Sequence, residues 1–202
     1  LRAIIGPNGA GKTTFMDIVT GKTRPDTGDV RWGVNGVSLL SKSEAKIAQL
    51  GIGRKFQKPS VFETQTVYDN LMMALSNNRN PFSVLAYKRN LNDDEKISNI
   101  AMQINLNEKM SVLAGELSHG QKQWLEIGML LIQQSDLLLI DEPVAGMTEI
   151  ETKKTSELLI NISKDRTVLV VEHDMNFIES LNVEVVVLNE GSLLTRGSMK
   201  NI

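Results

Sequence analysis

The stretch from residue 6 to residue 14 constrains this chain more than any other, because its pattern is G-x-x-x-x-G-K-T. Its glycines let backbone N–H groups turn inward around an anion without a clash from a Cβ atom. Lys12 supplies a mobile positive charge for the β and γ phosphates, and the hydroxyl of Thr13 suits Mg²⁺. The pattern therefore predicts a phosphate-binding loop formed by Gly6, Pro7, Asn8, Gly9, Ala10, Gly11, Lys12, Thr13 and Thr14.

The residues on either side of this loop favour the same interpretation. Residues 1–5 are typical of a short apolar strand, and residues 13–20 of the first turns of a helix. A helix N-terminus adds unpaired N–H groups and the positive end of its dipole to such a site. The competing interpretation is a glycine-rich turn with a chance lysine, but the strand before and the helix after indicate nucleotide binding.

Composition and charge exclude several classes of protein. The chain has 22 basic and 24 acidic side chains, and a net charge of −2 argues against a nucleic-acid-binding protein with a broad basic face. The absence of cysteine excludes a disulfide framework and a Cys-based metal site. The longest apolar runs, residues 137–140 and 168–171, are much shorter than a membrane span, and no signal peptide is visible.

The order of elements predicts an α/β domain. Apolar strands without polar alternation are separated by helix-like stretches, which is typical of a mostly parallel sheet covered on both faces. In the middle of the chain β-branched residues become rare, which predicts an inserted helical subdomain, and residues 184–196 predict an antiparallel hairpin. We therefore expect one α/β domain over residues 1–202, with a helical subdomain inserted from residue 67 onward.

A second candidate site follows the apolar strand of residues 137–143, which reads L-L-L-I-D-E-P. Side chains at the C-terminal end of a strand emerge where open α/β sheets bind ligands. We expect Asp141 to hold Mg²⁺ together with Thr13, and Glu142, on the opposite side of the pleat, to polarise an attacking water. An acidic turn after a core strand is the competing interpretation, and the phosphate-binding loop favours the catalytic one.

A third candidate is the start of the long helix that follows Ser118. Ser118 and Gln121 have the spacing of a capping box, which is a purely structural explanation. The same helix start also suits an anion, because Ser118 offers a hydroxyl and Gly120 allows close approach of the backbone. One phosphate-binding loop and a separate anion-seeking helix start suggest a nucleotide held between two subunits.

Two further polar residues stand at predicted strand ends. His173 follows the strand of residues 167–171 and is a candidate contact for a γ-phosphate, although a histidine at a strand end is often only solvated or capping. Gln57 follows another strand, and its neutral amide is a candidate for Mg²⁺ or the attacking water. Spacing alone leaves the role of Gln57 open.

These stretches, in this order, resemble the ATPase subunit of ABC transporters over nearly the whole chain. Residues 6–13 resemble its Walker A loop, and residues 137–142 its Walker B strand. Residues 117–121 resemble its signature motif, which is the most specific match because phosphate loops occur in many ATPases and GTPases. Gln57 resembles the glutamine of its Q-loop, and His173 its switch histidine.

The resemblance implies a P-loop NTPase fold with a RecA-like core lobe at residues 1–66 and 123–202 and a helical subdomain at residues 67–122. It also implies an ATPase that acts as a pair of subunits arranged head to tail. ATP on the Walker A loop of one subunit would be closed by Ser118, Gly120 and Gln121 of the other. Glu142 would be the catalytic base, and His173 would contact the γ-phosphate. His119 departs from the family pattern by placing a bulky side chain beside the phosphate contact of the partner subunit.

The resemblance also implies cofactors and partners. ATP and Mg²⁺ would be the cofactors, with Thr13, Gln57 and Asp141 as metal ligands. Gln57 and the helical subdomain would couple to a separate membrane permease, which would hold the protein at the cytoplasmic face of the cell membrane. Because residue 1 is a leucine in mid-strand, we expect missing upstream elements, including the aromatic residue that stacks on adenine in this family.

Within the family, two segments resemble the branch that imports branched-chain amino acids and urea. These are residues 117–126 and 143–147, and they resemble most the ATPase subunit of urea importers. The cargo never touches this subunit, so both cargoes stay open.

Three alternatives remain beside an importer. A soluble ABC-type ATPase that acts on DNA or ribosomes usually carries long coiled-coil insertions or two cassettes, and neither is visible here. A nucleotide-gated binding module without activity is disfavoured by intact Lys12, Asp141 and Glu142. A GTPase is disfavoured because the sequence has no N-K-x-D motif.

Overall fold

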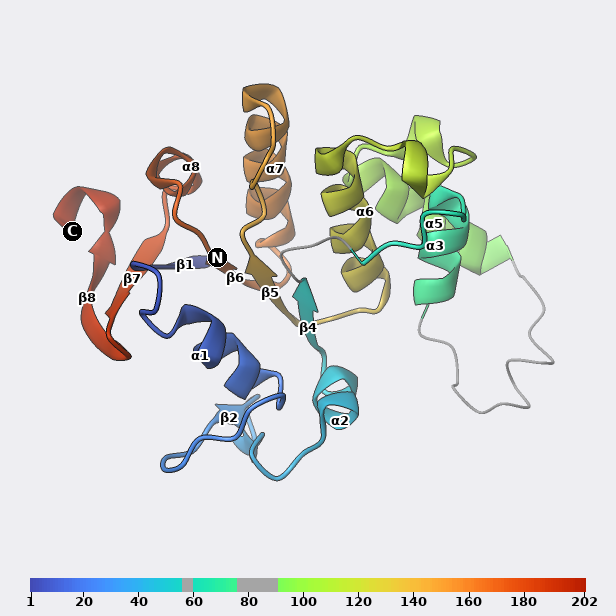
Figure 1. The fold of residues 1–202 in the computed structure, drawn as a ribbon. Helices are drawn as coiled ribbons and strands as arrows, with labels where there is room; N and C mark the ends of the chain where they lie inside the picture. The colour runs from blue at the N-terminus through green and yellow to red at the C-terminus, as the bar shows by residue number, and fades with distance from the viewer. Residues whose placement is uncertain (56–59, 76–90) are drawn as a thin grey trace. The chain divides into compact units, whose positions relative to one another are not determined.

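The computed structural model describes residues 1–55, 60–75 and 91–202 (Figure 1). Its strands are β1 (Arg2–Ile5), β2 (Arg31–Trp32), β3 (Val37–Ser38), β4 (Ile52–Lys55), β5 (Leu137–Asp141), β6 (Thr167–Val171), β7 (Glu184–Asn189) and β8 (Ser192–Ser198). Its α-helices are α1 (Lys12–Val19), α2 (Glu44–Gln49), α3 (Val67–Ala74), α5 (Leu91–Gln103), α6 (His119–Ile132), α7 (Glu149–Ile162) and α8 (Met175–Leu181). Short 3-10 turns lie at Asn107–Lys109, Ala114–Glu116 and Met199–Asn201.

The chain divides into two compact units, which are described separately. The first unit comprises residues 1–54, 135–143 and 159–202, and the second comprises residues 55–134 and 144–158. Within the second unit, α6 packs with α3 and α5.

The first unit is built on a six-stranded sheet with the order β4–β5–β6–β1–β7–β8. The pairs β5–β6, β6–β1 and β1–β7 are parallel, and β7–β8 is an antiparallel hairpin, which confirms the expected mostly parallel sheet. The register places Asp141 beside Val171, and Val171 beside Ile4. The segments that follow β5, β6 and β1 therefore leave the sheet at one common edge, where the candidate residues of this unit lie.

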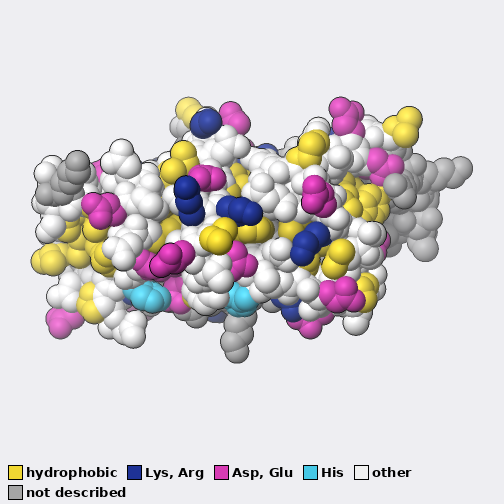
Figure 2. Space-filling model, turned by 90° about the horizontal axis from the view of Figure 1, so that it is seen from above, with side chains coloured by type: hydrophobic (Ala, Val, Ile, Leu, Met, Phe, Trp, Pro, Cys, Tyr) yellow, Lys and Arg dark blue, Asp and Glu magenta, His cyan; other side chains and the backbone are white. Residues whose placement is uncertain are grey.

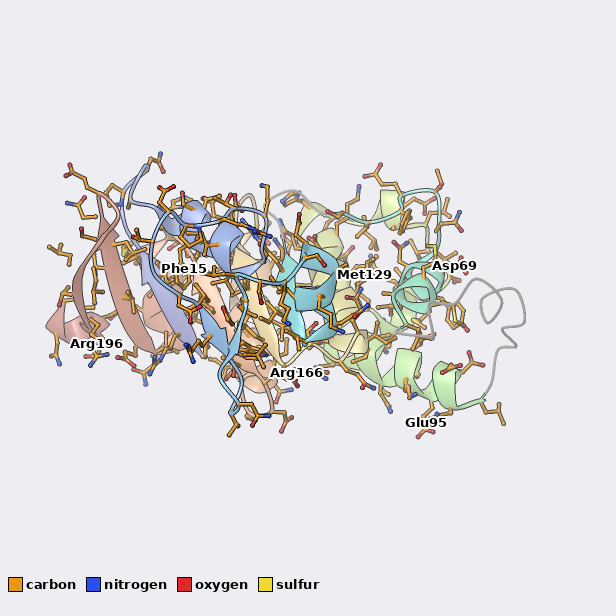
Figure 3. The ribbon with its side chains drawn as sticks, turned by 90° about the horizontal axis from the view of Figure 1, so that it is seen from below. Phe15, Asp69, Glu95, Met129, Arg166 and Arg196 are labelled. Atoms are coloured by element: carbon orange, nitrogen blue, oxygen red, sulfur yellow. The ribbon has the colours of Figure 1, made fainter. Side chains whose placement is uncertain are left out.

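The core of this unit fills the space between the sheet and the helices α1 and α2. Its buried members are Ile4, Met16, Val19, Leu39, Ile47, Ile52, Leu137, Leu139 and Val171. Strand β5 is buried along its full length, as expected for a parallel strand covered on both faces. Arg166, labelled in Figure 3, donates from Nη1 to the carbonyl oxygen of Ser135 at 2.6 Å, which joins the segments that lead into β6 and β5.

The second unit is helical, and α6 lies at its centre. Gly128 allows close packing, because a Cβ atom there would lie 2.5 Å from Cδ1 of Ile104 and 3.2 Å from Cδ2 of Leu71. The helices are also fixed at their ends. Thr66 and Asp69 form a capping box at the start of α3, where Figure 3 labels Asp69. The indole nitrogen of Trp124 on α6 donates to Oγ1 of Thr155 on α7 at 2.8 Å.

The surface shown in Figure 2 carries acidic and basic side chains side by side, without a continuous patch of one sign. This distribution agrees with the small net charge of −2. Within the described ranges, no helix combines the length and the apolar character that crossing a membrane requires.

Candidate functional site

The predicted phosphate-binding loop connects β1 directly to α1 in the first unit (Figure 1). Gly9 and Gly11 have φ values of +81° and +95°, a left-handed backbone that favours glycine. Gly11 is the N-cap of α1, and among the described residues no side chain caps this helix start. Nζ of Lys12 donates hydrogen bonds to the carbonyl oxygens of Gly6 at 2.7 Å and Pro7 at 3.0 Å. The loop thus presents backbone N–H groups and an ammonium group, which is a donor set that fits a phosphate.

The turn of the β7–β8 hairpin supports this loop from behind. The N–H of Gly191 donates to the carbonyl oxygen of Ala10 at 3.1 Å. A Cβ atom on Gly6 would lie 2.2 Å from the carbonyl oxygen of Leu188, so only glycine fits at that position. The sequence predicted the hairpin but not this contact, because nothing in the hairpin itself indicates that β7 pairs with β1.

At the end of β5, Asp141 is joined to α1 through Arg54. The guanidinium of Arg54 forms ion pairs with Asp17 on α1 and with Asp141, the second with Nη2 3.4 Å from Oδ2. Burial tends to raise the pKa of Asp17, but its hydrogen bonds and charge interactions with Arg54 and Lys22 outweigh burial and lower it. Mg²⁺ is usually held by one or two protein oxygens together with substrate phosphates, so Thr13 and Asp141 are suitable donors. Sequence reasoning missed Arg54, since its partners lie far away in the chain.

Replacing Arg54 with Met should destabilise the protein strongly, because two carboxylates then lose a buried cation. Only 5% of the Arg54 side chain is exposed, and removing one partner of a buried ion pair typically costs about 3–5 kcal/mol. We expect the free energy of unfolding, measured in urea, to fall by about 3 kcal/mol.

Arg31→Met is the matched control, because Arg31 pairs with Asp29 while 70% of its side chain is exposed. Such an exposed surface pair contributes little to stability. Equal losses of unfolding free energy in the two variants would show that the buried Arg54 pairs stabilise the protein no more than a surface pair does.

The residues that follow β5 and β6 bring a carboxylate and an imidazole together. Glu142 has a φ of +46° and donates its N–H to the carbonyl oxygen of Val171 at 2.9 Å. Nδ1 of His173 lies 3.5 Å from Oε1 of Glu142 and 3.6 Å from Oε2 of Glu172. Glu172 is buried, and its carboxylate accepts the N–H groups of His173 and Asp174. The imidazole is 68% exposed and therefore available to a ligand, while its backbone is held by Glu172.

In the second unit, the start of α6 has the predicted capping box. Oγ of Ser118 accepts the N–H of Gln121 at 3.2 Å, and Oε1 of Gln121 accepts the N–H of Ser118 at 3.1 Å. Nζ of Lys109 also donates to Oε1 of Gln121, at 3.1 Å. The side chain of Gln121 is therefore engaged in fixing the helix start.

A carboxylate from α7 lies against the same helix start and was missed by sequence reasoning. The hydroxyl of Ser118 donates to Oε1 of Glu151 at 2.7 Å, and a Cβ atom on Gly120 would lie 2.7 Å from the same carboxylate. His119 is exposed, and its ring lies beside Gly146 and within 3.1 Å of Nε2 of Gln123. Both histidines of the chain lie at the surface, where Figure 2 shows histidine side chains in cyan.

The candidate residues are thus distributed over both units. The first unit contains the loop of residues 6–14 with Asp141, Glu142 and His173, and the second contains Ser118, Gly120 and Gln121. Gln57 lies outside the described residues.

Comparisons with known proteins show what this chain is similar to. A family model described as ABC transporter matches residues 1–145. The chain is 32% identical to the high-affinity branched-chain amino acid transport ATP-binding protein BraF of Pseudomonas aeruginosa, over 99% of this chain and 81% of the relative. It is 31% identical to the corresponding protein LivG of Salmonella typhimurium, with the same coverage. The solved ADP conformation of an ATP-binding cassette from an ABC transporter matches with a TM-score of 0.84 and 28% identity, over 100% of this chain and 81% of that one.

Proposed function

The chain belongs to the ABC transporter family, and from that membership we propose that it is the ATP-binding subunit of an importer for urea. As an ABC ATPase it binds ATP with Mg²⁺ and couples ATP hydrolysis to transport. It is of the branched-chain amino acid type, to which BraF and LivG belong by name. Urea is the finer proposal, and it is supported by the resemblance of residues 117–126 and 143–147 to urea-importer ATPase subunits.

The observation that carries the catalytic proposal is the 3.5 Å contact between Glu142 and His173. Both follow strands that end at the same edge of the sheet as β1, from which the phosphate-binding loop departs. Glu142 acts as general base for the attacking water, and His173 contacts the γ-phosphate. Thr13 and Asp141, with Gln57, would hold Mg²⁺, which would neutralise charge on the β and γ phosphates.

The proposed active unit is a pair of subunits arranged head to tail. Each nucleotide lies on the loop of one subunit and is closed by Ser118, Gly120 and Gln121 of the other. The start of α6 supports this role, because a helix N-terminus favours an anion and Gly120 carries no Cβ atom toward one. The partner ATPase subunit is either identical or a related chain.

A separate permease completes the proposed importer. Within each subunit we assign residues 1–66 and 123–202 to the ATPase core lobe, and residues 67–122 to the helical subdomain that couples to the permease. Gln57 takes part in this coupling. The protein then lies at the cytoplasmic face of the cell membrane and contacts the membrane only through the permease.

Transport by the purified complex tests the cargo. The full-length protein should co-purify with a membrane permease, and vesicles containing the complex should accumulate labelled urea only when ATP is supplied on the side of this subunit. Accumulation of leucine instead of urea would contradict the urea assignment and leave the importer in place. Co-purification with ribosomes or DNA, and no membrane protein, would contradict the importer itself.

A further inference from the structure

The carboxylate of Glu151 serves the starts of two helices in the second unit. Its Oε2 accepts hydrogen bonds from the N–H and the hydroxyl of Thr148, both at 3.0 Å, at the start of its own helix α7. Its Oε1 accepts the hydroxyl proton of Ser118 at 2.7 Å, at the start of α6. One oxygen is therefore used for local capping, and the other reaches a residue 33 positions away in the chain.

The contact uses the only proton of the Ser118 hydroxyl. A serine hydroxyl has one donor and two acceptor positions. Oγ of Ser118 accepts from the N–H of Gln121 and donates to Glu151. While this arrangement persists, the hydroxyl has no proton for a phosphate oxygen.

The same carboxylate also lies where an anion would approach the helix start. A Cβ atom on Gly120 would be 2.7 Å from both Cδ and Oε1 of Glu151, so the carboxylate covers the opening that this glycine leaves. The hydrogen bond from Ser118, followed by those from Thr148, lowers the pKa of Glu151. The group is ionised at neutral pH, and it repels a phosphate that approaches the same position.

We propose that Glu151 is a positioning residue that holds Ser118 away from phosphate and must release it when the nucleotide of the partner subunit arrives. This inference rests on the proposed function, in which Ser118 and Gly120 close over ATP bound to the other subunit. The consequence is that pairing of subunits requires a higher ATP concentration than binding of ATP to the Walker A loop of one subunit. The reason is that the incoming phosphate must first displace a carboxylate.

A purely structural role of Glu151 has a different consequence. As the residue that caps α7 through Thr148, it would contribute to stability and leave the ATP dependence of pairing unchanged. The two roles are therefore separated by measuring pairing against ATP concentration and melting temperature on the same variants.

The experiment compares Glu151→Gln with its parent in a Glu142→Gln background, which keeps ATP intact. Light scattering gives the ATP concentration at half-maximal pairing, and calorimetry gives the affinity of the monomer for Mg·ATP at protein concentrations too low for pairing. Because hydrogen bonds to a charged group are stronger than neutral ones, we expect half-maximal pairing at an ATP concentration about tenfold lower in the Gln variant. The affinity of the monomer should stay unchanged.

Glu149→Gln is the matched control, since Glu149 is an exposed acid in the same first turn of α7. It removes the same charge from the same helix end and should not change pairing. Glu151→Ala, which removes all the hydrogen bonds of the carboxylate, should lower the ATP requirement at least as much, even where its melting temperature falls.

Two results would overturn the proposal. If the parent pairs with ATP and both Glu151 variants need as much ATP or more, Glu151 does not restrain Ser118. If the Glu142→Gln parent stays monomeric at saturating Mg·ATP, the shared nucleotide of the proposed function is wrong, and the role of Glu151 is refuted with it.

Discussion

Replacing Glu142 with Gln should abolish most of the ATP turnover, leave Mg·ATP binding intact and trap an ATP-bound pair of subunits. In the proposed mechanism, the change removes the base that takes a proton from the attacking water, while Lys12, Thr13 and Asp141 would still hold the nucleotide and its metal. Because general base catalysis contributes roughly 10²- to 10⁴-fold, we expect phosphate release to slow by at least about a hundredfold.

Phosphate release and light scattering should be measured on the same samples. Glu179→Gln is a suitable control, because it removes an exposed acid of α8 and should keep full turnover. Turnover equal to that of the parent would remove Glu142 from the mechanism. A slow variant that also fails to bind Mg·ATP would instead assign Glu142 to nucleotide binding.

The geometry around Glu142 explains why this change should separate binding from hydrolysis. Glu142 and Asp141 are neighbours in sequence but have different partners: His173 lies near the first, and Arg54 pairs with the second. The substitution therefore acts on the His173 side of the strand end and leaves the ion pairs of Asp141 in place. A loss of stability as large as that expected for Arg54→Met would contradict this separation.

Replacing Lys12 with Ala should weaken the binding of Mg·ATP by about ten- to a hundredfold, since hydrogen bonds to charged groups contribute about 1.5–3 kcal/mol. Without the ammonium group, the charge on the β and γ phosphates is no longer balanced by the loop. The same group donates to the carbonyl oxygens of Gly6 and Pro7, so the variant also loses contacts within the loop.

Calorimetric titration with Mg·ATP measures this effect, and circular dichroism checks that the fold is retained. Lys46→Ala provides the control, because Lys46 is exposed on α2 and bonds only to groups of its own helix segment among the contacts that the structure describes. Equal affinity of the Lys12 variant and the parent would contradict the assignment of the loop as the phosphate site.

Local chemistry explains which parts of the fold were predictable. The starts of α2, α6 and α8 are capped by Ser43, Ser118 and Asp174, each through a backbone N–H three residues ahead. The Ser118 capping box was predicted from the sequence, because a side chain and its target lie within one helical turn. The β7–β8 hairpin was predictable for the same reason, since its turn at residues 189–191 joins neighbouring strands.

The packing of α6 was less predictable. The sequence predicted a helical subdomain over residues 67–122, and in the structure α6 packs with α3 and α5 in the second unit. Its apolar residues and its small Gly128 suit burial against either a sheet or other helices. Only the tertiary structure decides which elements pack against α6.

The sequence by itself predicted the phosphate-binding loop, the succession of strands and helices along the chain, and the two adjacent carboxylates at the end of β5. Each of these depends on residues within a few positions of one another. Only the tertiary structure decided that Arg54 lies between Asp17 and Asp141, that Gly191 supports the loop, and that Glu151 holds Ser118. These contacts join residues that are 33 or more positions apart in the chain. Their partners are selected by strand order and helix packing, which no short pattern in the chain records.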